Sequence, residues 1–309
     1  MTEPEGGLRL GTRGSALAVR QAEWVSAELR ARWPALRPEI VRIKTSGDRI
    51  QTRSLAEIGG KGLFVKEIEE ALRDGRIDVG IHSMKDLPAT LAPGLDIAAV
   101  PPREDARDVL IARASGGLAG LALGARVGTS SLRRGAFLRH VRSDVSVVPM
   151  RGNVDTRIAK WRAGEVDAIV LAGAGLRRLG LAVPEAQRLS TEEMLPAIGQ
   201  GALAIEARPG GRGWALARAL ENEDARDAVS AERAFLAGMG GDCTTPIAAH
   251  ATVTDGALQL EAAIGDADGR RLIRGSRAGK RTEGEAIGRS LAEELLGRGG
   301  REILRELGR

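Results

Sequence analysis

Residues 77–88 read Ile-Asp-Val-Gly-Ile-His-Ser-Met-Lys-Asp-Leu-Pro, an alternating apolar run that ends in a polar cluster and a proline. The alternation predicts a short β-strand, and the proline stops regular structure. In an open α/β sheet, ligands bind just beyond the carboxyl ends of the strands. Lys85 and Asp86 therefore indicate a site that holds an anionic ligand and stabilises positive charge. A strand end whose two charged side chains point into water explains the same spacing.

Strand-like and helix-like segments alternate on both sides of this stretch. We expect strands at 8–10, 39–44, 79–81 and 95–100 and helices at 15–33 and 64–73. After a proline linker at 101–102, we expect strands at 125–127, 145–148, 168–171 and 202–206 and helices at 131–141 and 154–161. This order predicts wound, largely parallel sheets.

The pattern changes after about residue 222. A helix at 225–236 leads to Gly-Met-Gly-Gly-Asp-Cys at 238–243, and strands at 247–253, 258–264 and 271–275 precede a C-terminal helix. Such an arrangement is typical of an α+β unit with an antiparallel sheet. With 309 residues, the chain is long enough for two or three domains.

The composition narrows the class of ligand. The single cysteine excludes an internal disulfide and favours a reducing cytoplasm, and no apolar run has the length of a membrane span. Aromatic residues are 2% with no tyrosine, so platforms for stacking single-stranded nucleic acid are scarce. The net charge of +5 therefore fits a small polyanionic ligand better than DNA or RNA. A solvated basic surface fits it equally.

Basic residues gather where expected strands meet expected helices. The three junctions are Thr-Arg-Gly-Ser at 12–15, Gly-Thr-Ser-Ser-Leu-Arg-Arg at 128–134, and Arg-Gly-Asn at 151–153 followed by Arg157. Arginine in the first turn of a helix opposes the dipole preference for acidic residues. As a set, these arginines indicate carboxylate binding by paired guanidinium bonds. For any one of them, a solvated surface position remains an alternative.

Three further signals in the sequence are weaker. Gly-Gly-Lys-Gly at 59–62 lacks the spacing of a phosphate-binding P-loop, and a glycine-rich surface loop explains it as well. The three histidines lack metal-ligand spacing, so no metal is expected, and His82 is interpreted as a hydrogen-bonded residue at a strand end. Cys243 is either a buried apolar residue or, within its glycine-rich surroundings, an accessible nucleophile.

Five motifs occur together in this chain, at 59–64, 82–88, 128–134, 151–153 and around Cys243. In these motifs and their order, the sequence resembles the porphobilinogen deaminase (hydroxymethylbilane synthase) family over nearly its whole length. The resemblance implies an α/β fold of two periplasmic-binding-protein-like domains with a cleft between them, plus a C-terminal α+β domain with a small antiparallel sheet. The implied domains are 1–101 with 201–219, then 102–200, and 220–309, which carries the cofactor cysteine.

The resemblance also implies an enzyme, a transferase of tetrapyrrole and heme biosynthesis. Such an enzyme joins four porphobilinogen molecules, releasing ammonia each time, onto a dipyrromethane primer bonded to Cys243 through a thioether. It then releases linear hydroxymethylbilane by hydrolysis. Asp86 is the implied catalytic residue, which hydrogen-bonds pyrrole N–H groups, stabilises the azafulvenium cation and assists proton transfer.

Other residues inherit binding roles from the resemblance. Beside Cys243, the cofactor is expected to contact Ser83, Lys85, Thr129, Ser131, Arg133, Arg134, Arg151 and Gly152. The substrate is expected to contact Arg13, Ser15, Lys61, Arg157, Arg178 and Gln200. Many family members have lysine where this chain has Glu57, so the anion-binding role of that loop position is in doubt.

Two other classes of protein remain open. A non-catalytic protein that binds anionic solutes on the same two-lobed fold would explain the arginines, but it would not need Cys243 or Asp86. A nucleic-acid-binding protein rests on net charge alone. The expectation is a cytoplasmic monomer that binds porphobilinogen and neither nucleic acid nor membrane.

Overall fold

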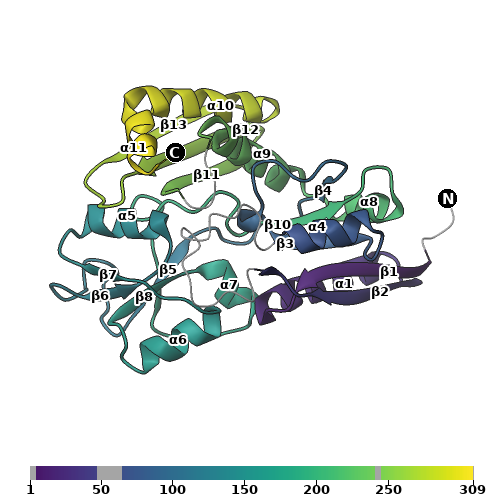
Figure 1. Ribbon diagram of the computed structural model, residues 1–309, viewed down its shortest axis with the longest axis horizontal. Helices are drawn as coiled ribbons and strands as arrows, with labels where there is room; N and C mark the ends of the chain where they lie inside the picture. The colour runs from purple at the N-terminus through teal and green to yellow at the C-terminus, as the bar shows by residue number, and fades with distance from the viewer. Residues whose placement is uncertain (1–4, 47–64, 241–244, 309) are drawn as a thin grey trace. The chain divides into compact units, whose positions relative to one another are not determined.

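The computed structural model describes residues 5–46, 65–240 and 245–308 and divides into two compact units (Figure 1). The first unit comprises Met1–Arg103 and Ala202–Arg226, and the second comprises Glu104–Gly201 and Asp227–Arg309. Each unit is therefore assembled from two separate stretches of the chain.

The first unit is built on a five-stranded sheet with the order β2-β1-β3-β10-β4. Its strands are β1 (Gly6–Arg13), β2 (Leu36–Ile43), β3 (Val79–Ser83), β4 (Asp96–Ala99) and β10 (Leu203–Ala207). Its helices are α1 (Ala16–Arg32), α4 (Lys66–Arg73), α8 (Arg212–Ala217) and the 3₁₀ turns η1 (Met84–Asp86) and η2 (Arg218–Leu220). Strand β1 runs parallel to β2 and β3, whereas β10 runs antiparallel to β3 and β4.

The strands of the first unit are rich in apolar residues because their side chains form its core. Leu8 and Leu10 of β1 and Ile81 of β3 are buried together with Val25 and Leu29 of α1. The first helix begins as expected, since the Ser15 hydroxyl accepts the Ala18 N–H at 3.3 Å and caps it.

The second unit contains a sheet with the order β7-β6-β8-β5-β9. Its strands are β5 (Asp108–Ala112), β6 (Arg126–Gly128), β7 (Ser146–Val148), β8 (Ala168–Ala172) and β9 (Ala186–Arg188), with helices α5 (Leu132–Val141), α6 (Val154–Arg162) and α7 (Gly173–Arg178). Strands β6, β7 and β8 are parallel, and β5 is antiparallel to β8 and β9. Both five-stranded sheets thus place one antiparallel strand beside the third parallel one.

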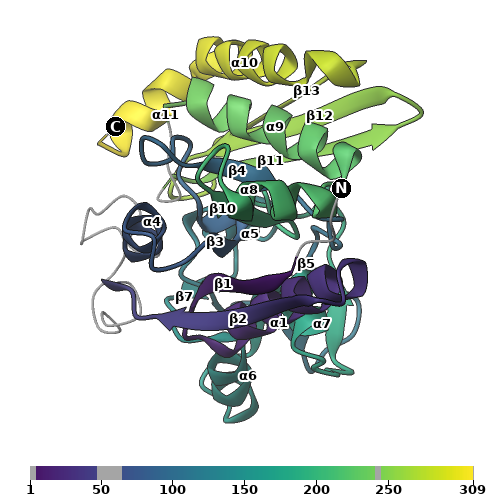
Figure 2. The same cartoon turned by 90° about the vertical axis from the view of Figure 1, so that its right-hand side faces the viewer.

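The remainder of the second unit is an antiparallel sheet covered by helices (Figure 2). It consists of β11 (Ile247–Thr254), β12 (Ala257–Gly265), β13 (Leu272–Lys280), α9 (Glu223–Gly238), α10 (Gly284–Leu295), α11 (Arg301–Glu306) and the turns η3 (Arg281–Glu283) and η4 (Leu296–Gly300). Phe235 of α9, Leu260 of β12 and Leu291 of α10 are fully buried in one cluster.

The antiparallel sheet also packs against α5. Ala248 and Ala263 share a buried cluster with Phe137 and Leu138. The β12–β13 turn fits closely on α5, because a Cβ at Gly269 would lie 2.5 Å from the Ala136 oxygen. The predicted fold class, two α/β sheets and a small antiparallel C-terminal sheet, is confirmed. The division into three domains and the cleft stay predictions.

Candidate anion-binding and catalytic site

In the first unit, the candidate residues follow the carboxyl ends of β1 and β3, which are neighbours in the sheet. Arg13 ends β1, and Asp86 lies in η1 directly after β3. The Arg13 Nη1 atom lies 3.7 Å from Asp86 Oδ2, and the two side chains are 20% and 34% exposed. The structure therefore brings a predicted substrate ligand and the predicted catalytic carboxylate together at a partly open position.

Hydrogen bonds from α1 and to the segment before β10 hold the end of β3 in place. Ser83 Oγ accepts a hydrogen bond from Gln21 Nε2 at 2.9 Å, and the Met84 N–H donates to the Ala202 oxygen of the segment leading into β10. Thr12 Oγ1 donates to the Ala18 oxygen, which joins the end of β1 to the first turn of α1. These bonds fix the backbone on both sides of the strand end, and thereby the positions from which Lys85 and Asp86 extend.

In the second unit, the two arginines in the first turn of α5 are buried and paired within the chain, which the sequence did not predict. Ser131 caps the helix, with its Oγ 3.4 Å from the Arg134 N–H, and Thr129 Oγ1 accepts the Ser131 N–H at 3.2 Å. Arg133 and Arg134 are buried, with 4% and 6% of their surface exposed. The alternative of a solvated basic surface is therefore wrong for these two arginines.

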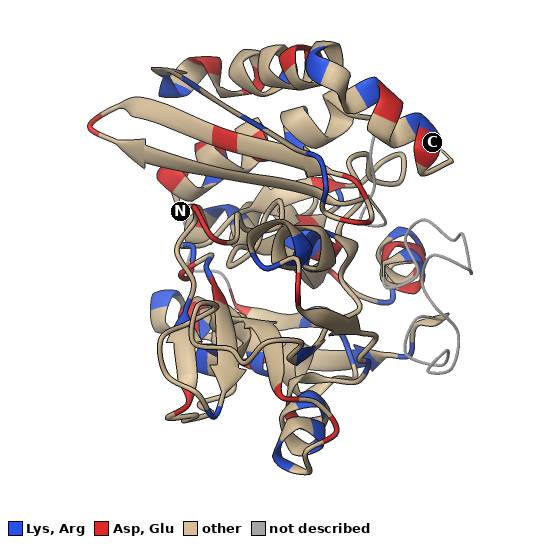
Figure 3. Cartoon of the chain, turned by 90° about the vertical axis from the view of Figure 1, so that its left-hand side faces the viewer, with Lys and Arg blue, Asp and Glu red and all other residues tan. Residues whose placement is uncertain are grey.

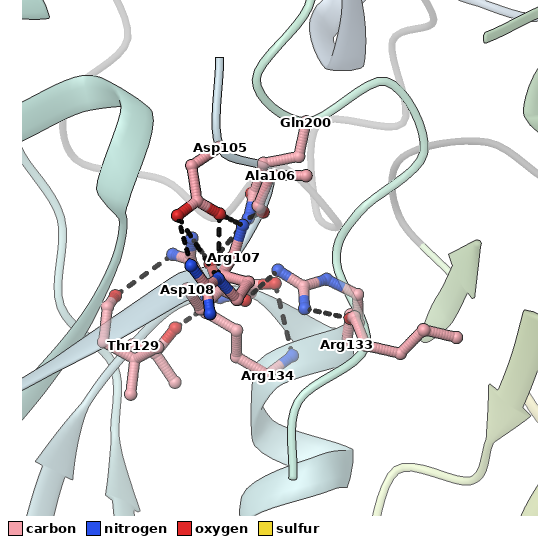
Figure 4. A network of polar contacts seen from close by, with 11 residues as sticks. Asp105, Ala106, Arg107, Asp108, Thr129, Arg133, Arg134 and Gln200 are labelled. Carbon is pink, nitrogen blue, oxygen red and sulfur yellow. Dashed lines mark hydrogen bonds and ion pairs between the residues drawn. The ribbon is translucent and has the colours of Figure 1, made fainter. Parts of the chain in front are cut away.

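Both guanidiniums pair with a carboxylate that the sequence analysis missed, Asp108 (Figure 4). Arg133 Nη2 lies 2.8 Å from Asp108 Oδ2, and Arg134 Nη2 donates to Asp108 Oδ1 at 2.8 Å. Burial opposes ionisation of Asp108, but the two guanidiniums outweigh it and hold the pKa of this carboxyl below its usual range. The signal was present: an acidic residue opens the apolar run of 109–112.

The two arginines retain donors despite this pairing. Arg133 Nη1 donates to the Leu195 oxygen at 2.6 Å, and Arg134 Nη1 donates to the Val170 oxygen at 3.1 Å. Within the described part of the chain, the Nε–H of each has no hydrogen-bond acceptor although it is buried. An unsatisfied buried donor is costly, so an acceptor supplied by a ligand would be favourable here.

A third junction adds more positive charge. Gly152 has a φ of +117°, and a Cβ there would lie 2.8 Å from Thr156 Cγ2, so glycine is required. Its oxygen accepts a hydrogen bond from Arg157 Nε at 2.8 Å. Burial, Arg134 and Arg151 lower the pKa of Arg157 to about 10. Among the described residues, no acidic side chain pairs with Arg157, so this group of like charges is suited to an anion.

Two further predicted substrate ligands are engaged within the second unit. Arg178 Nη2 donates to the Gly201 oxygen at 2.7 Å, and burial lowers its pKa to about 10 although Glu104 opposes the shift. Gln200 is 1% exposed, and its Nε2 donates to the Ala106 oxygen at 2.7 Å and to Asp108 Oδ1 at 2.8 Å. Gln200 thus belongs to the network around Asp108, and its substrate contact stays a prediction.

The remaining expectations concern residues outside the described part of the chain, metal binding and membrane spans. Cys243, Lys61 and Glu57 lie outside the described residues. Within residues 5–46, 65–240 and 245–308, no group of His, Cys, Asp and Glu side chains could hold a metal ion. No helix in this part of the chain combines the length and apolar character needed to cross a membrane.

Elsewhere in the described chain, acidic and basic residues are largely mixed with one another (Figure 3). Figure 3 shows acidic and basic positions alternating along the C-terminal helices, where Arg289 pairs with Glu285 and Arg298 with Glu294, each at 3.1 Å. Such exposed pairs contribute little to stability and leave little net charge for a ligand. The buried Arg133 and Arg134 and the half-buried Arg157 are therefore the better candidates for anion binding.

Comparison with known proteins shows which family the chain resembles. The family described as "Porphobilinogen deaminase, dipyromethane cofactor binding domain" matches residues 8–214, and "Porphobilinogen deaminase, C-terminal domain" matches residues 227–297. Proteins named porphobilinogen deaminase from Syntrophotalea carbinolica and Syntrophobacter fumaroxidans are 50% and 47% identical over 301 residues. These alignments cover 97% of this chain and 96% and 97% of the relatives.

The chain belongs to the porphobilinogen deaminase family.

Family membership confirms several predictions. The porphobilinogen deaminase family is one of transferases in tetrapyrrole biosynthesis, and its domain description names the predicted dipyrromethane cofactor. Among solved structures, an ancestral cationic amino acid solute binding protein matches with a TM-score of 0.44 at 14% identity, covering 70% of this chain and 88% of that chain. A likeness of that size supports no functional conclusion.

The residues present fit an anionic oligopyrrole cofactor. The unpaired Nε–H donors of Arg133 and Arg134 are buried, and Arg157 has no acidic partner among the described residues. Carboxylates supply the charge and the acceptors that these groups lack. The individual roles of the site residues, including the attachment at Cys243, stay predictions.

Proposed function

We propose that this chain is a hydroxymethylbilane synthase. It joins four porphobilinogen molecules by stepwise deaminative condensation, using a dipyrromethane primer on Cys243, and releases linear hydroxymethylbilane by hydrolysis. The observation that carries the proposal is the group of three neighbouring arginines, Arg134, Arg151 and Arg157, in which burial and the repulsion between like charges lower the pKa of Arg157. Each porphobilinogen adds an acetate and a propionate, so the growing product is a polyanion that such a group can hold.

The proposed binding roles follow the chemistry of carboxylates. Cofactor carboxylates would be held by Ser83, Lys85, Thr129, Ser131, Arg133, Arg134, Arg151 and Gly152. Substrate carboxylates would be held by Arg13, Ser15, Lys61, Arg157, Arg178 and Gln200. Bidentate guanidinium pairing fixes orientation as well as affinity. When bound, the dipyrromethane supplies the pyrrole carbon to which the first substrate is joined.

The proposed catalytic role belongs to Asp86. Loss of ammonia from porphobilinogen leaves a delocalised azafulvenium cation on the substrate. A carboxylate accepts pyrrole N–H bonds and carries the opposite charge, so Asp86 would stabilise that cation and assist proton transfer to the departing amine. The ion pair with Arg13 at 3.7 Å supports this role, because it holds the carboxylate in a partly exposed position.

We also propose that the enzyme acts as a monomer in the cytoplasm, with neither nucleic acid nor membrane as a partner. The alternative, a non-catalytic protein that binds anionic solutes, would make no use of Asp86 as an acid–base group or of a thioether at Cys243.

The decisive experiment compares the intact masses of the denatured native protein and the Cys243→Ala variant. Because the sequence has one cysteine, a thioether adduct has a single possible position. The native protein should exceed its sequence mass by one dipyrrole and react with an aldehyde reagent for pyrroles, whereas Cys243→Ala should do neither. The native protein should also convert porphobilinogen to hydroxymethylbilane. An unmodified protein that forms this product would refute the cofactor assignment, and absence of product would favour the solute-binding alternative.

A further inference from the structure

One carboxylate in the second unit serves two arginines at once. Asp108 is the first residue of β5 and is completely buried. Its Oδ1 accepts hydrogen bonds from Arg134 Nη2 and Gln200 Nε2, both at 2.8 Å, while its Oδ2 lies 2.8 Å from Arg133 Nη2. The two guanidiniums and the carboxylate together leave one net positive charge in the interior.

The pairing fixes the orientation of each guanidinium. In both arginines, Nη1 donates to a main-chain oxygen and Nη2 faces Asp108, so both terminal nitrogens are occupied (Figure 4). Each Nη nitrogen thus has a partner, whereas the buried Nε–H has no acceptor in either arginine among the described residues. A purely structural triad would be expected to satisfy these donors as well.

The network is also anchored to a distant helix. Gln200, which bonds Asp108, directly follows Gly199, whose N–H donates to Glu232 Oε2 of α9 at 2.6 Å. The other oxygen of Glu232 accepts the Ala251 N–H of β11 at 2.8 Å. Asp108 is thus held by elements that the packing of the second unit already fixes, so it can impose its orientation on the arginines.

We propose that Asp108 is a positioning residue of the anion site: it orients Arg133 and Arg134 so that their Nε–H edges receive ligand carboxylates. This inference rests on the proposed function, because it assigns those carboxylates to the cofactor. The burial of all three side chains supports it, since a guanidinium without its countercharge would not remain in this position.

The test uses protein expressed in cells that cannot make porphobilinogen, so that it lacks the cofactor. After porphobilinogen is added, the gain of dipyrrole mass is followed in the wild type and in Asp108→Asn and Asp108→Glu. Asparagine removes the countercharge, and glutamate keeps it but displaces it by one methylene. We expect both variants to gain the mass roughly tenfold or more slowly, the size of a lost hydrogen bond to a charged group. Asp108→Glu keeps the negative charge that pairs with both arginines, so it still tests the proposal if Asp108→Asn does not fold.

Asp105→Asn is the matched control. Asp105 lies three residues earlier, is partly buried, and pairs with Arg107 at 2.8 Å rather than with Arg133 or Arg134. This variant should gain the mass at the wild-type rate.

A double-mutant cycle separates positioning from a merely structural role. The rate of mass gain and kcat/KM are measured for Asp108→Glu, Arg134→Lys and the double variant. If Asp108 acts through Arg134, the double variant should be about as slow as the slower single variant. Effects that multiply, or Asp108 variants that load at the wild-type rate, would overturn the positioning role. A wild-type protein that gains no dipyrrole mass would instead overturn the proposed function.

Discussion

His82 and Glu206 meet in the interior of the first unit, with His82 Nε2 2.9 Å from Glu206 Oε2. Their side chains are 3% and 0% exposed. The contact joins β3 to the antiparallel strand β10 directly before Lys85 and Asp86. Gly80 leaves room for it, because a Cβ there would lie 2.9 Å from His82 Nε2. The prediction that His82 is a hydrogen-bonded residue at a strand end is confirmed.

The first testable prediction concerns this pair. His82→Ala should lower the free energy of unfolding by about 3 kcal/mol, because it leaves a buried carboxyl group without its partner. Replacing both residues, as His82→Leu with Glu206→Met, should recover most of that loss. Urea denaturation measures both values. His140→Ala is the control, since His140 is exposed and bonds the Gly269 oxygen, so its loss should cost about 1 kcal/mol. Equal losses in the single and double variants would contradict a coupled pair.

The second prediction tests the role of Asp86. Asp86→Asn should lower turnover by a factor of about 10²–10³, because the size is kept while the charge that opposes the azafulvenium cation is lost. Asp86→Glu should retain measurable activity, since it keeps the charge. Hydroxymethylbilane formation is measured with cofactor-loaded enzyme, so that failed cofactor assembly is not mistaken for failed catalysis. Near-native turnover by loaded Asp86→Asn would reduce Asp86 to a strand-end residue.

The third prediction concerns Arg157, whose half-buried guanidinium is close to Arg134 and Arg151. Arg157→Leu should lower kcat/KM about tenfold or more, and Arg157→Lys should recover part of it, because lysine restores the charge but not the planar fork. The thermal stability of the cofactor-free Leu variant should not fall, since a repelled cation has been removed. Arg162→Leu, on the exposed side of the same helix, provides the control. A stability loss without an activity loss would assign Arg157 to the fold alone.

The fourth prediction follows from the sequence around Lys61. If this lysine contacts substrate carboxylates, Lys61→Gln should raise KM with little change in kcat. Glu57→Lys should be neutral or mildly improving, because lysine is the residue that many family members have there. Steady-state kinetics with porphobilinogen measures both effects. A strong loss in Glu57→Lys would show that the acidic residue has a function of its own.

The fifth prediction concerns acid stability. The hydrogen bond from Arg107 lowers the pKa of Asp105 to about 2, and the pKa of Asp108 is also held below its usual range. A carboxyl group with a lowered pKa in the folded state stabilises the fold above its unfolded pKa near ~3.9. That contribution is lost as the pH falls through the folded value. The stability deficit of Asp105→Asn should therefore be constant above about pH 5 and shrink between about pH 4 and 2. A deficit independent of pH would contradict this.

The sequence predicted the elements of the fold well where the signal is local. The sequence places Ser15 and Ser131 at helix starts, and both residues cap their helices, α1 and α5. The strand expected at 202–206 is β10. The sequence analysis missed β5 and β9, because a short, fully buried strand and a three-residue strand paired with it carry no periodicity of their own.

The candidate site was predicted less completely. An arginine in the first turn of a helix indicated an anionic partner, and for Arg133 and Arg134 the structure supplies one from within the chain. Asp108 lies more than twenty residues before them, and the sequence contains no measure of that proximity. The same limit applies to Gln200, whose amide is held by Ala106 and Asp108.

The sequence by itself determined the family, the alternation of strands and helices, and the kinds of side chain at the strand and helix ends, because these depend on residue identity and on spacing along the chain. Only the tertiary structure decided which arginines are buried and paired with Asp108 and which face like charges without an acidic partner, as Arg157 does among the described residues. The physical reason is that electrostatic energy depends on distance and burial, and both are set when strands from separate stretches of the chain pair.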